Sequence, residues 1–321
     1  MISTVLVPLD GSPVAEQAIP YAQALLPDGG EGVLLRIVPE LDPLLTELLW
    51  TLESAPESAE TAAVRAELER VKARVTDTRV RWITDVASGD PAEEILKAIT
   101  RHRIGLVAMT THGRGALGRT TFGSVADRVS RESPIPVLLV RAHPDGLPVV
   151  TADIRRLIVP LDGSDLAEAS LPLVVDLAKQ LGIPVHLVRA LNLAAVLTPL
   201  VDGGGLLVSP SPEVYEQMTE SVESDAREYL TSVSTRLEEE GVSATWSVLE
   251  GSPFFAIAEA TETGDLLVTT SHGRGGVLRW LMGSVAEKLV REAPVPVLLV
   301  PSVSRGTGTA LADAAEGDSA T

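Results

Sequence analysis

A glycine-rich stretch that contains basic residues, THGRGALGRTTFGS (residues 111–124), has the composition of a phosphate-binding loop. Glycine lets backbone N–H groups approach phosphate oxygens closely, and arginine can offset the phosphate charge. Gly113, Gly115 and Gly118 also satisfy the G-x-G-x-x-G spacing of a dinucleotide loop. The stretch therefore raises the question of which phosphate-containing group it would bind.

The chain repeats itself, and the repeat includes this stretch. SHGRGGVLRWLMGS (271–284) matches it, LIVPLDGS (157–164) matches VLVPLDGS (5–12), and PVPVLLV (294–300) matches PIPVLLV (134–140). The order is the same in both halves, and the period is far longer than that of a solenoid repeat. We therefore predict two whole domains, 1–148 and 153–303, joined by a segment rich in Pro, Gly and Asp, and a disordered tail over 304–321.

The repeat argues against a dinucleotide loop. Gly118 becomes Leu278 in the second copy, so the third glycine is not shared. A dinucleotide loop also belongs in the first strand–helix turn of its domain, whereas this one follows the fourth predicted strand. NAD is therefore rejected as the ligand.

Apolar runs alternate with segments of helical spacing in each copy. In the first copy we predict strands at 3–9, 32–38, 79–87, 105–110 and 136–140, and helices at 12–26, 57–76, 91–102 and 124–132. Pro20 lies inside the first of these helices, where a proline is unfavourable. Apolar strands that alternate with helices predict an α/β fold, in which a parallel five-stranded sheet is covered by helices on both faces.

Composition limits the possible partners. The 321 residues carry 44 acidic and 26 basic side chains, which gives a formal net charge of -18. Such an acidic surface repels nucleic acids and anionic membranes, and no apolar run is long enough to span a bilayer. There are no cysteines, which excludes thiolate chemistry. With no signal-peptide pattern, we expect a cytoplasmic protein.

Both copies share H-G-R-G at 112–115 and 272–275, followed by Gly-Ser at 123–124 and 283–284. Nine residues separate Gly113 from Gly123, and the second copy keeps this spacing. Here the chain resembles the universal stress protein family, whose ATP-binding members carry G-x-x-G-(nine residues)-G-S/T after the fourth strand. The resemblance covers nearly the whole chain twice, although Thr110 and Thr270 stand where the family has its first glycine.

The resemblance implies two flavodoxin-like (adenine nucleotide alpha hydrolase-like) domains with strand order 3-2-1-4-5. It also implies a regulatory or stress-response protein that binds ATP or a related adenine nucleotide, with Mg²⁺ as an optional companion of the phosphates. Family members pair through their fifth strands, so we expect the two domains to pair within the chain, and a homodimer is a further option.

The nucleotide would lie beyond the carboxyl ends of the first and fourth strands, where the strand order reverses. Gly123 and Ser124 start a helix and would bind phosphate, Asp10 would accept a hydrogen bond from the adenine or ribose end, and Ile37 and Met109 would flank the adenine. The candidate site residues of the first domain are Pro8, Leu9, Asp10, Ile37, Met109, Thr110, His112, Gly113, Arg114, Gly123, Ser124 and Val125. Those of the second domain are Pro160, Leu161, Asp162, Ala190, Thr269, Thr270, His272, Gly273, Arg274, Gly283, Ser284 and Val285.

Simpler interpretations stand beside these assignments. Ser124 with Asp127, and Ser284 with Glu287, fit a capping box that only starts a helix. Asp10 and Asp162 fit a turn, and the histidines lack a partner pattern for catalysis or metal binding. Two alternative functions also remain: a slow ATPase, or a protein-interaction scaffold in which the threonines have closed the nucleotide site.

Overall fold

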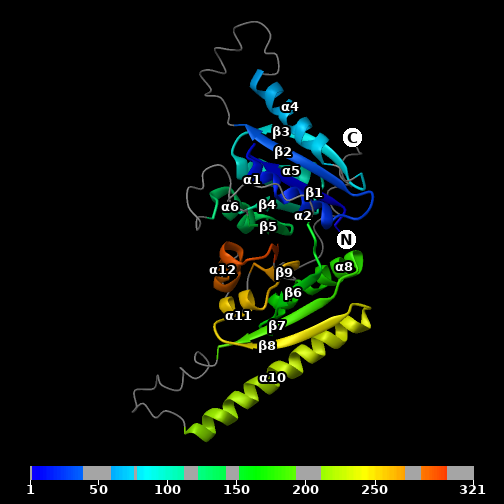
Figure 1. Cartoon of the computed structure of the whole chain (residues 1–321). Coiled ribbons are helices and arrows are strands. Elements are labelled where there is room, and N and C mark those ends of the chain that lie inside the picture. Colours follow the sequence, from blue (N-terminus) through cyan, green and yellow to red (C-terminus); the bar gives the residue numbers. More distant parts are fainter. Residues whose placement is uncertain are drawn as a thin grey trace, which may run out of the picture.

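The chain folds into one ten-stranded sheet with helices on both faces, as the computed structural model in Figure 1 shows. The strand order is β3-β2-β1-β4-β5-β10-β9-β6-β7-β8. The structure describes residues 2–38, 59–75, 78–111, 122–141, 152–192, 211–271 and 283–301.

Strands and helices alternate in both halves, as the sequence predicts. The first half contains β1 (Thr4–Leu9), α1 (Pro13–Glu16), α2 (Ala18–Ala24), β2 (Glu31–Val38), α4 (Ala59–Arg74), β3 (Arg81–Ser88), α5 (Pro91–Arg101), β4 (Leu106–Thr110), α6 (Ser124–Glu132) and β5 (Val137–Val140). The second half contains β6 (Arg156–Pro160), α7 (Asp165–Glu168), α8 (Leu171–Leu181), β7 (Val185–Leu191), α10 (Pro212–Glu239), β8 (Ala244–Glu250), α11 (Pro253–Glu259), β9 (Asp265–Thr270), α12 (Ser284–Glu292) and β10 (Val297–Val300).

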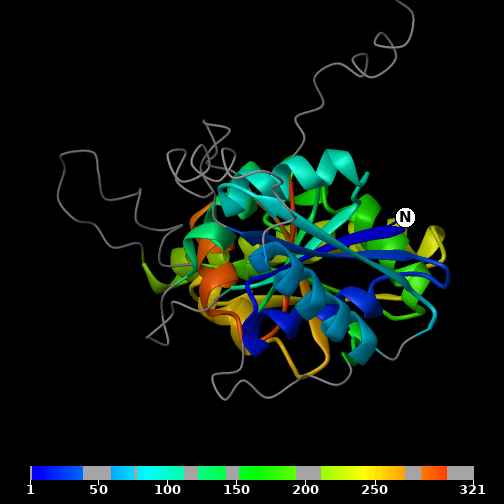
Figure 2. The same ribbon diagram turned by 90° about the horizontal axis from the view of Figure 1, so that it is seen from above.

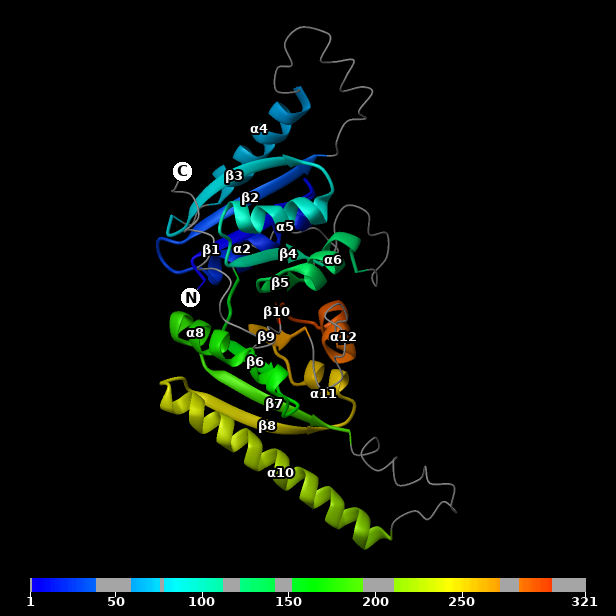
Figure 3. The same cartoon turned by 180° about the vertical axis from the view of Figure 1, so that it is seen from behind.

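The two halves join through their fifth strands. Pairing within each half is parallel, but β5 and β10 run antiparallel, with Leu138 opposite Leu298. Figures 1 and 3 show the halves stacked about this junction, with α6 next to α12. The expected pairing of the two domains within the chain is therefore present.

Each face of the sheet has an apolar core that runs through both halves. Apolar side chains of α1, α2, α4, α7, α8 and α10 pack on one face, and those of α5, α6, α11 and α12 pack on the other. Seen from above in Figure 2, helices lie on both sides of the sheet. Because strand side chains alternate in direction, Leu138 joins the first core and Leu139 the second.

The predicted single helix over 12–26 is wrong, since the chain forms two short helices there. Gln17, with φ −63° and ψ −17°, separates α1 from α2. Pro20 has no N–H to donate to the carbonyl of Glu16, the last residue of α1, so a continuous helix would lose this bond and meet the proline ring. In contrast, the expected solvated helix over 57–76 is present as α4, with Leu68 and Val71 buried against the sheet.

Candidate functional site

The candidate site lies where the strand order reverses. β1 pairs with β2 on one side and with β4 on the other, and β6 lies between β7 and β9 in the same way. β1 ends at Leu9 and β4 ends at Thr110, and both strands point to the same edge of the sheet. The residues that follow these strands, remote in sequence, therefore come together at this edge.

Hydrogen bonds fix both ends of the glycine-rich stretch. The N–H of Thr111 donates to the carbonyl of Val140 over 3.0 Å, and the N–H of Gly123 donates to the carbonyl of Thr111 over 2.9 Å. Ser271 and Gly283 repeat the second of these bonds at 2.8 Å in the other half. The start of α6 or α12 is therefore held at the carboxyl end of the fourth strand of its half.

Glycine occupies the cap position of both helices. Gly123 precedes the first turn of α6 with φ −66°, and Gly283 precedes that of α12 with φ −59°. A glycine cap has no side chain with which to bond the helix start, whereas Ser12, Asp90 and Ser164 cap α1, α5 and α7 through their side-chain oxygens. The cap residue itself therefore provides no side-chain acceptor for the first N–H groups of α6 and α12, and N–H groups at a helix start can bind an anion.

The predicted capping box is wrong in both halves. Ser124 and Ser284 are the first residues inside their helices, one position too late for the hydroxyl to cap. The carbonyl of Gly123 accepts from the N–H of Asp127 over 2.8 Å, so the glycine supplies the first helical bond. Both serines are exposed at the helix start.

Asp10 and Asp162 each stabilise a turn. Asp10 Oδ1 accepts from the N–H of Ser12 over 2.9 Å and from its hydroxyl over 2.5 Å, and Asp162 bonds Ser164 in the same way. Gly11 follows Asp10 with φ 79°, a value that favours glycine. The turn interpretation of these aspartates is therefore confirmed, while their expected bond to a nucleotide stays a prediction.

Apolar candidates lie on one face of the sheet. Met109 belongs to the core beneath α5 and α6, and Ile37 and Val125 pack against it. Ala190 and Val285 take the equivalent places in the second half. Met109 is 6% exposed, so only a small part of its side chain is open to a ligand.

The threonines at the end of the fourth strands do not lie on this face. Thr110 alternates with Met109 along β4, so its side chain lies on the opposite face, the one to which Ala108 belongs. Thr110 and Thr270 are both buried, at 7% and 5% exposure. A threonine side chain here therefore lies on the face of the sheet opposite to that of Met109.

The remaining candidates divide into three groups. Thr269 is half-buried, and because it alternates with Thr270 along β9, it lies on the opposite face of the sheet from that residue. Leu9 and Leu161 are buried in the core, and Pro8 and Pro160 are half-buried at the ends of the first strands. The candidates that lie outside the described residues are His112, Gly113, Arg114, His272, Gly273 and Arg274.

The sequence did not predict a pocket that lies between the end of β1 and α4. It is lined by Leu9, Gly11, Glu16, Arg36, Val64, Glu67, Leu68 and Val71. The ion pair between Arg74 of α4 and Glu16 (2.8 Å) has a counterpart in the second half, between Arg236 of α10 and Glu168 (2.7 Å). These pairs align α4 with α10, so that Glu67, seven residues before Arg74, corresponds to Tyr229, seven residues before Arg236.

In the second half, Tyr229 stands where the first half has Glu67. Its ring lies 5.1 Å from the guanidinium carbon of Arg189, and its hydroxyl donates to Glu168 Oε1 over 2.9 Å. Burial, followed by the hydrogen bond to Glu168, raises the pKa of Tyr229. The two halves therefore have the same fold but different side chains beside the ends of β1 and β6.

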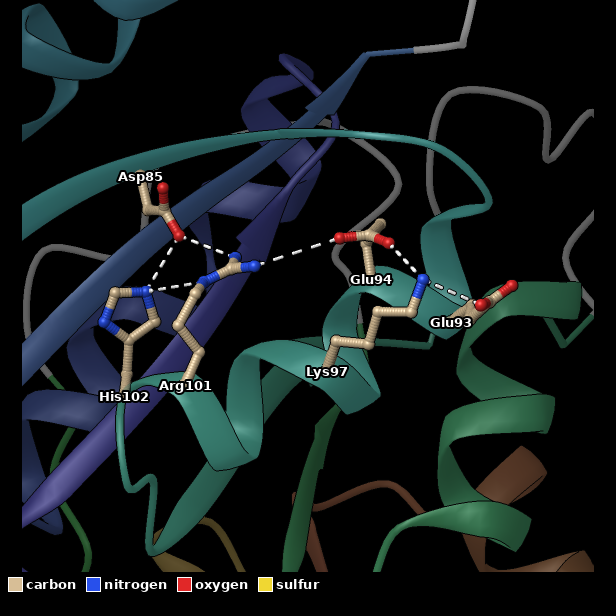
Figure 4. A network of polar contacts seen from close by, with 6 residues as sticks. All are labelled: Asp85, Glu93, Glu94, Lys97, Arg101 and His102. Atoms are coloured by element: carbon tan, nitrogen blue, oxygen red, sulfur yellow. Dashed lines mark hydrogen bonds and ion pairs between the residues drawn. The ribbon is translucent and has the colours of Figure 1, made fainter.

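A polar network fastens α5 to the edge strand β3, away from the candidate site (Figure 4). Asp85 Oδ2 lies 2.8 Å from both His102 Nε2 and Arg101 Nη2. Burial raises the pKa of Asp85, but the hydrogen bonds from His102 and Arg101 outweigh it and lower the pKa overall. Among the described residues, no group of three or more acidic or histidine side chains has the arrangement of a metal site.

Within the described ranges, no helix is both long enough and apolar enough to cross a bilayer. The sequence profile of the universal stress protein family matches residues 1–141 and 153–301. The chain therefore belongs to the universal stress protein family, with one family domain in each half.

Individual relatives agree with this assignment. A universal stress protein of Methanocaldococcus jannaschii is 31% identical over 148 residues, 46% of this chain and 81% of that protein. A universal stress protein of Mycobacterium tuberculosis is 27% identical over 195 residues, 60% of this chain and 61% of that protein, so the match spans less than two thirds of it. The crystal structure of a universal stress protein from Archaeoglobus fulgidus has a TM-score of 0.60 at 20% identity, and the match covers 94% of this chain and all of that one.

Proposed function

We propose that this chain binds ATP or a related adenine nucleotide in each half, and that it acts as a regulatory stress-response protein. The proposal concerns binding and not turnover. The relatives are called universal stress proteins, and one from Bacillus subtilis is called a stress response protein. The stress-response role is taken from these names and from membership of the family.

One observation carries the nucleotide proposal. In both halves the cap residue of a helix is a glycine, and its N–H is hydrogen-bonded to the carbonyl of the residue that follows the fourth strand. The positive end of the helix dipole and the N–H groups of the first turn favour a phosphate there, and the absence of a Cβ at Gly123 leaves room for its oxygens.

The surroundings of the helix start fit the rest of the nucleotide. Ile37 and Met109 would supply apolar contact for the adenine, and Asp10 could accept a hydrogen bond from the ribose or adenine end. Mg²⁺ would be carried by the phosphates, since the described residues offer no cluster of metal ligands.

Titration of the full chain with ATP in a calorimeter tests the proposal, with GTP as the control for base selectivity. We expect two ATP molecules per chain and weaker binding of GTP. Mass spectrometry of ligand released from the purified, denatured protein should also find an adenine nucleotide. An absence of ATP binding, together with an absence of released nucleotide, would reject the proposal and favour a protein-interaction scaffold.

A further inference from the structure

Four charged side chains of α6 and α12 form ion pairs between the two halves. Arg131 bonds Asp127 within its own helix, with Nε–Oδ2 and Nη2–Oδ1 both at 3.1 Å, and Arg291 pairs with Glu287 at 3.1 Å. Each arginine also reaches the acid of the other half, at 3.6 Å for Arg131–Glu287 and 3.5 Å for Arg291–Asp127. We call these four residues the interdomain quartet.

The quartet is partly shielded from water. The exposed fractions of its side chains are 24% for Arg131, 33% for Asp127, 36% for Arg291 and 38% for Glu287. The hydrogen bond to Asp127 raises the pKa of Arg131, so this guanidinium stays charged. Partial burial and the sharing of partners make such pairs stronger than isolated pairs at the surface.

The acids of the quartet lie in the first turns of the two helices. Asp127 comes four residues after Gly123, and its N–H bonds the carbonyl of that glycine. A carboxylate so close to the helix start repels an anion bound there. The two arginines offset this charge, and for Asp127 one of them belongs to the second half.

Arg291 also contacts the residue beside the glycine. Its guanidinium carbon lies 5.2 Å from the ring centroid of Phe122, which is 8% exposed and directly precedes Gly123. Such a cation–π contact is stronger when it is shielded from water. The second half therefore packs on the residue that leads into the cap of α6.

We infer that Arg291 is a positioning residue for the phosphate site of the first half: it offsets the charge of Asp127 and holds Phe122 next to Gly123. Arg131 offsets Glu287 for the second site. This inference rests on the proposed nucleotide function. It means that each site is completed by an arginine from the other half, so an isolated half binds nucleotide more weakly than the same half in the full chain.

The test uses the full chain with Gly283→Val, which leaves the first site as the only one expected to bind ATP. In this background we expect Arg291→Gln to weaken ATP binding about fivefold at low salt, and Arg291→Lys to recover part of the loss because it keeps the positive charge. Arg128→Gln is the matched control, because Arg128 lies on α6 but pairs with Asp90 and Glu132 of its own half. This control should leave the affinity unchanged.

A second parent variant, Asp127→Asn, shows whether Arg291 acts by offsetting the charge of Asp127 or whether its loss merely disturbs the structure. With Asp127→Asn there is no carboxylate to offset, so Arg291→Gln should cost less than twofold. An equal loss in both backgrounds would overturn the inference, as would an unchanged affinity in the Arg291→Gln chain. If the Gly283→Val chain and the parent chain both fail to bind ATP, the proposed function itself is rejected, and the inference with it.

Discussion

Leu138 of β5 and Leu298 of β10 lie opposite each other at the junction of the two halves, and neither side chain is exposed to solvent. The sheet and both of its apolar cores therefore continue from one half into the other. Hydrogen bonds from Gln180 to the carbonyl of Leu25 (2.9 Å) and from Arg141 to the carbonyl of Glu292 (3.0 Å) add contacts on either side of this junction.

The junction should hold the halves together without a covalent link. We expect a chain cut at a protease site inserted between residues 145 and 150 to elute from gel filtration as a single species, because separation would expose two apolar strand edges. Adding Leu298→Asp to the cut chain should separate the halves, because it buries a carboxylate at the junction. Free separation of the cut parent chain would mean that the strand pairing is weak.

The network around Asp85 should make stability depend on acid pH. Because its folded pKa lies below the ordinary value near 3.9, the carboxylate stabilises the fold above about pH 4. This stabilisation is lost as the pH falls through the folded pKa, where the carboxylate takes up a proton. Asp85→Asn should therefore lower the free energy of unfolding by about 1 kcal/mol at pH 7 and flatten its acid dependence.

Urea unfolding between pH 3 and pH 7 measures this effect. Asp28→Asn is the matched control, because Asp28 is 81% exposed and its ion pair with Arg79 spans 3.5 Å. Equal losses in the Asp85 and Asp28 variants would mean that the network shown in Figure 4 does not stabilise the fold.

The two proposed sites should differ in affinity, with the first one tighter. Ile37 and Met109 are replaced by Ala190 and Thr269 in the second half, which offers an adenine ring less apolar surface. At about 25 cal/mol per Å², a few tens of Å² correspond to roughly 1 kcal/mol, or about fivefold in Kd. Because Met109 is almost fully buried, most of this difference should come from Ile37.

Single exchanges in the second half test that ranking. In a Gly123→Val chain, Ala190→Ile should tighten ATP binding several-fold, and Thr269→Met should have a smaller effect. Two neutral exchanges, or a tighter second site in the parent chain, would mean that apolar bulk beside the adenine does not determine the affinity.

Much of the fold could be predicted because local patterns in the sequence determine it. The alternation of apolar strands with helices, and the repeat of PIPVLLV as PVPVLLV, predicted two α/β halves. Their pairing through the fifth strands followed from the resemblance to the universal stress protein family, and it is present. The break at Gln17 could have been predicted as well, because Pro20 cannot donate to the carbonyl of Glu16.

The candidate site was harder to predict than the fold, because it depends on the exact residue at which a helix begins and on contacts between the two halves. The S-x-x-D spacing of Ser124 and Asp127 suggested a capping box, but the helix begins one residue earlier than that box requires, and Asp127 pairs with arginines. Asp127–Arg131 and Glu287–Arg291 both occur four residues apart, and this repeat is the sequence signal for the quartet. Which half each arginine reaches depends on the packing of α6 against α12, and no spacing within one helix reveals it.

The central claim is that a phosphate binds at the glycine-capped starts of α6 and α12, and ATP titration of the Gly123→Val, Gly283→Val chain tests it most directly. With φ values of −66° and −59°, both positions accept a side chain without backbone strain, so the variant should keep the circular dichroism and melting temperature of the parent. We predict two ATP molecules per parent chain and at least a tenfold loss of affinity in the variant. A folded variant that binds ATP as tightly as its parent would contradict the claim.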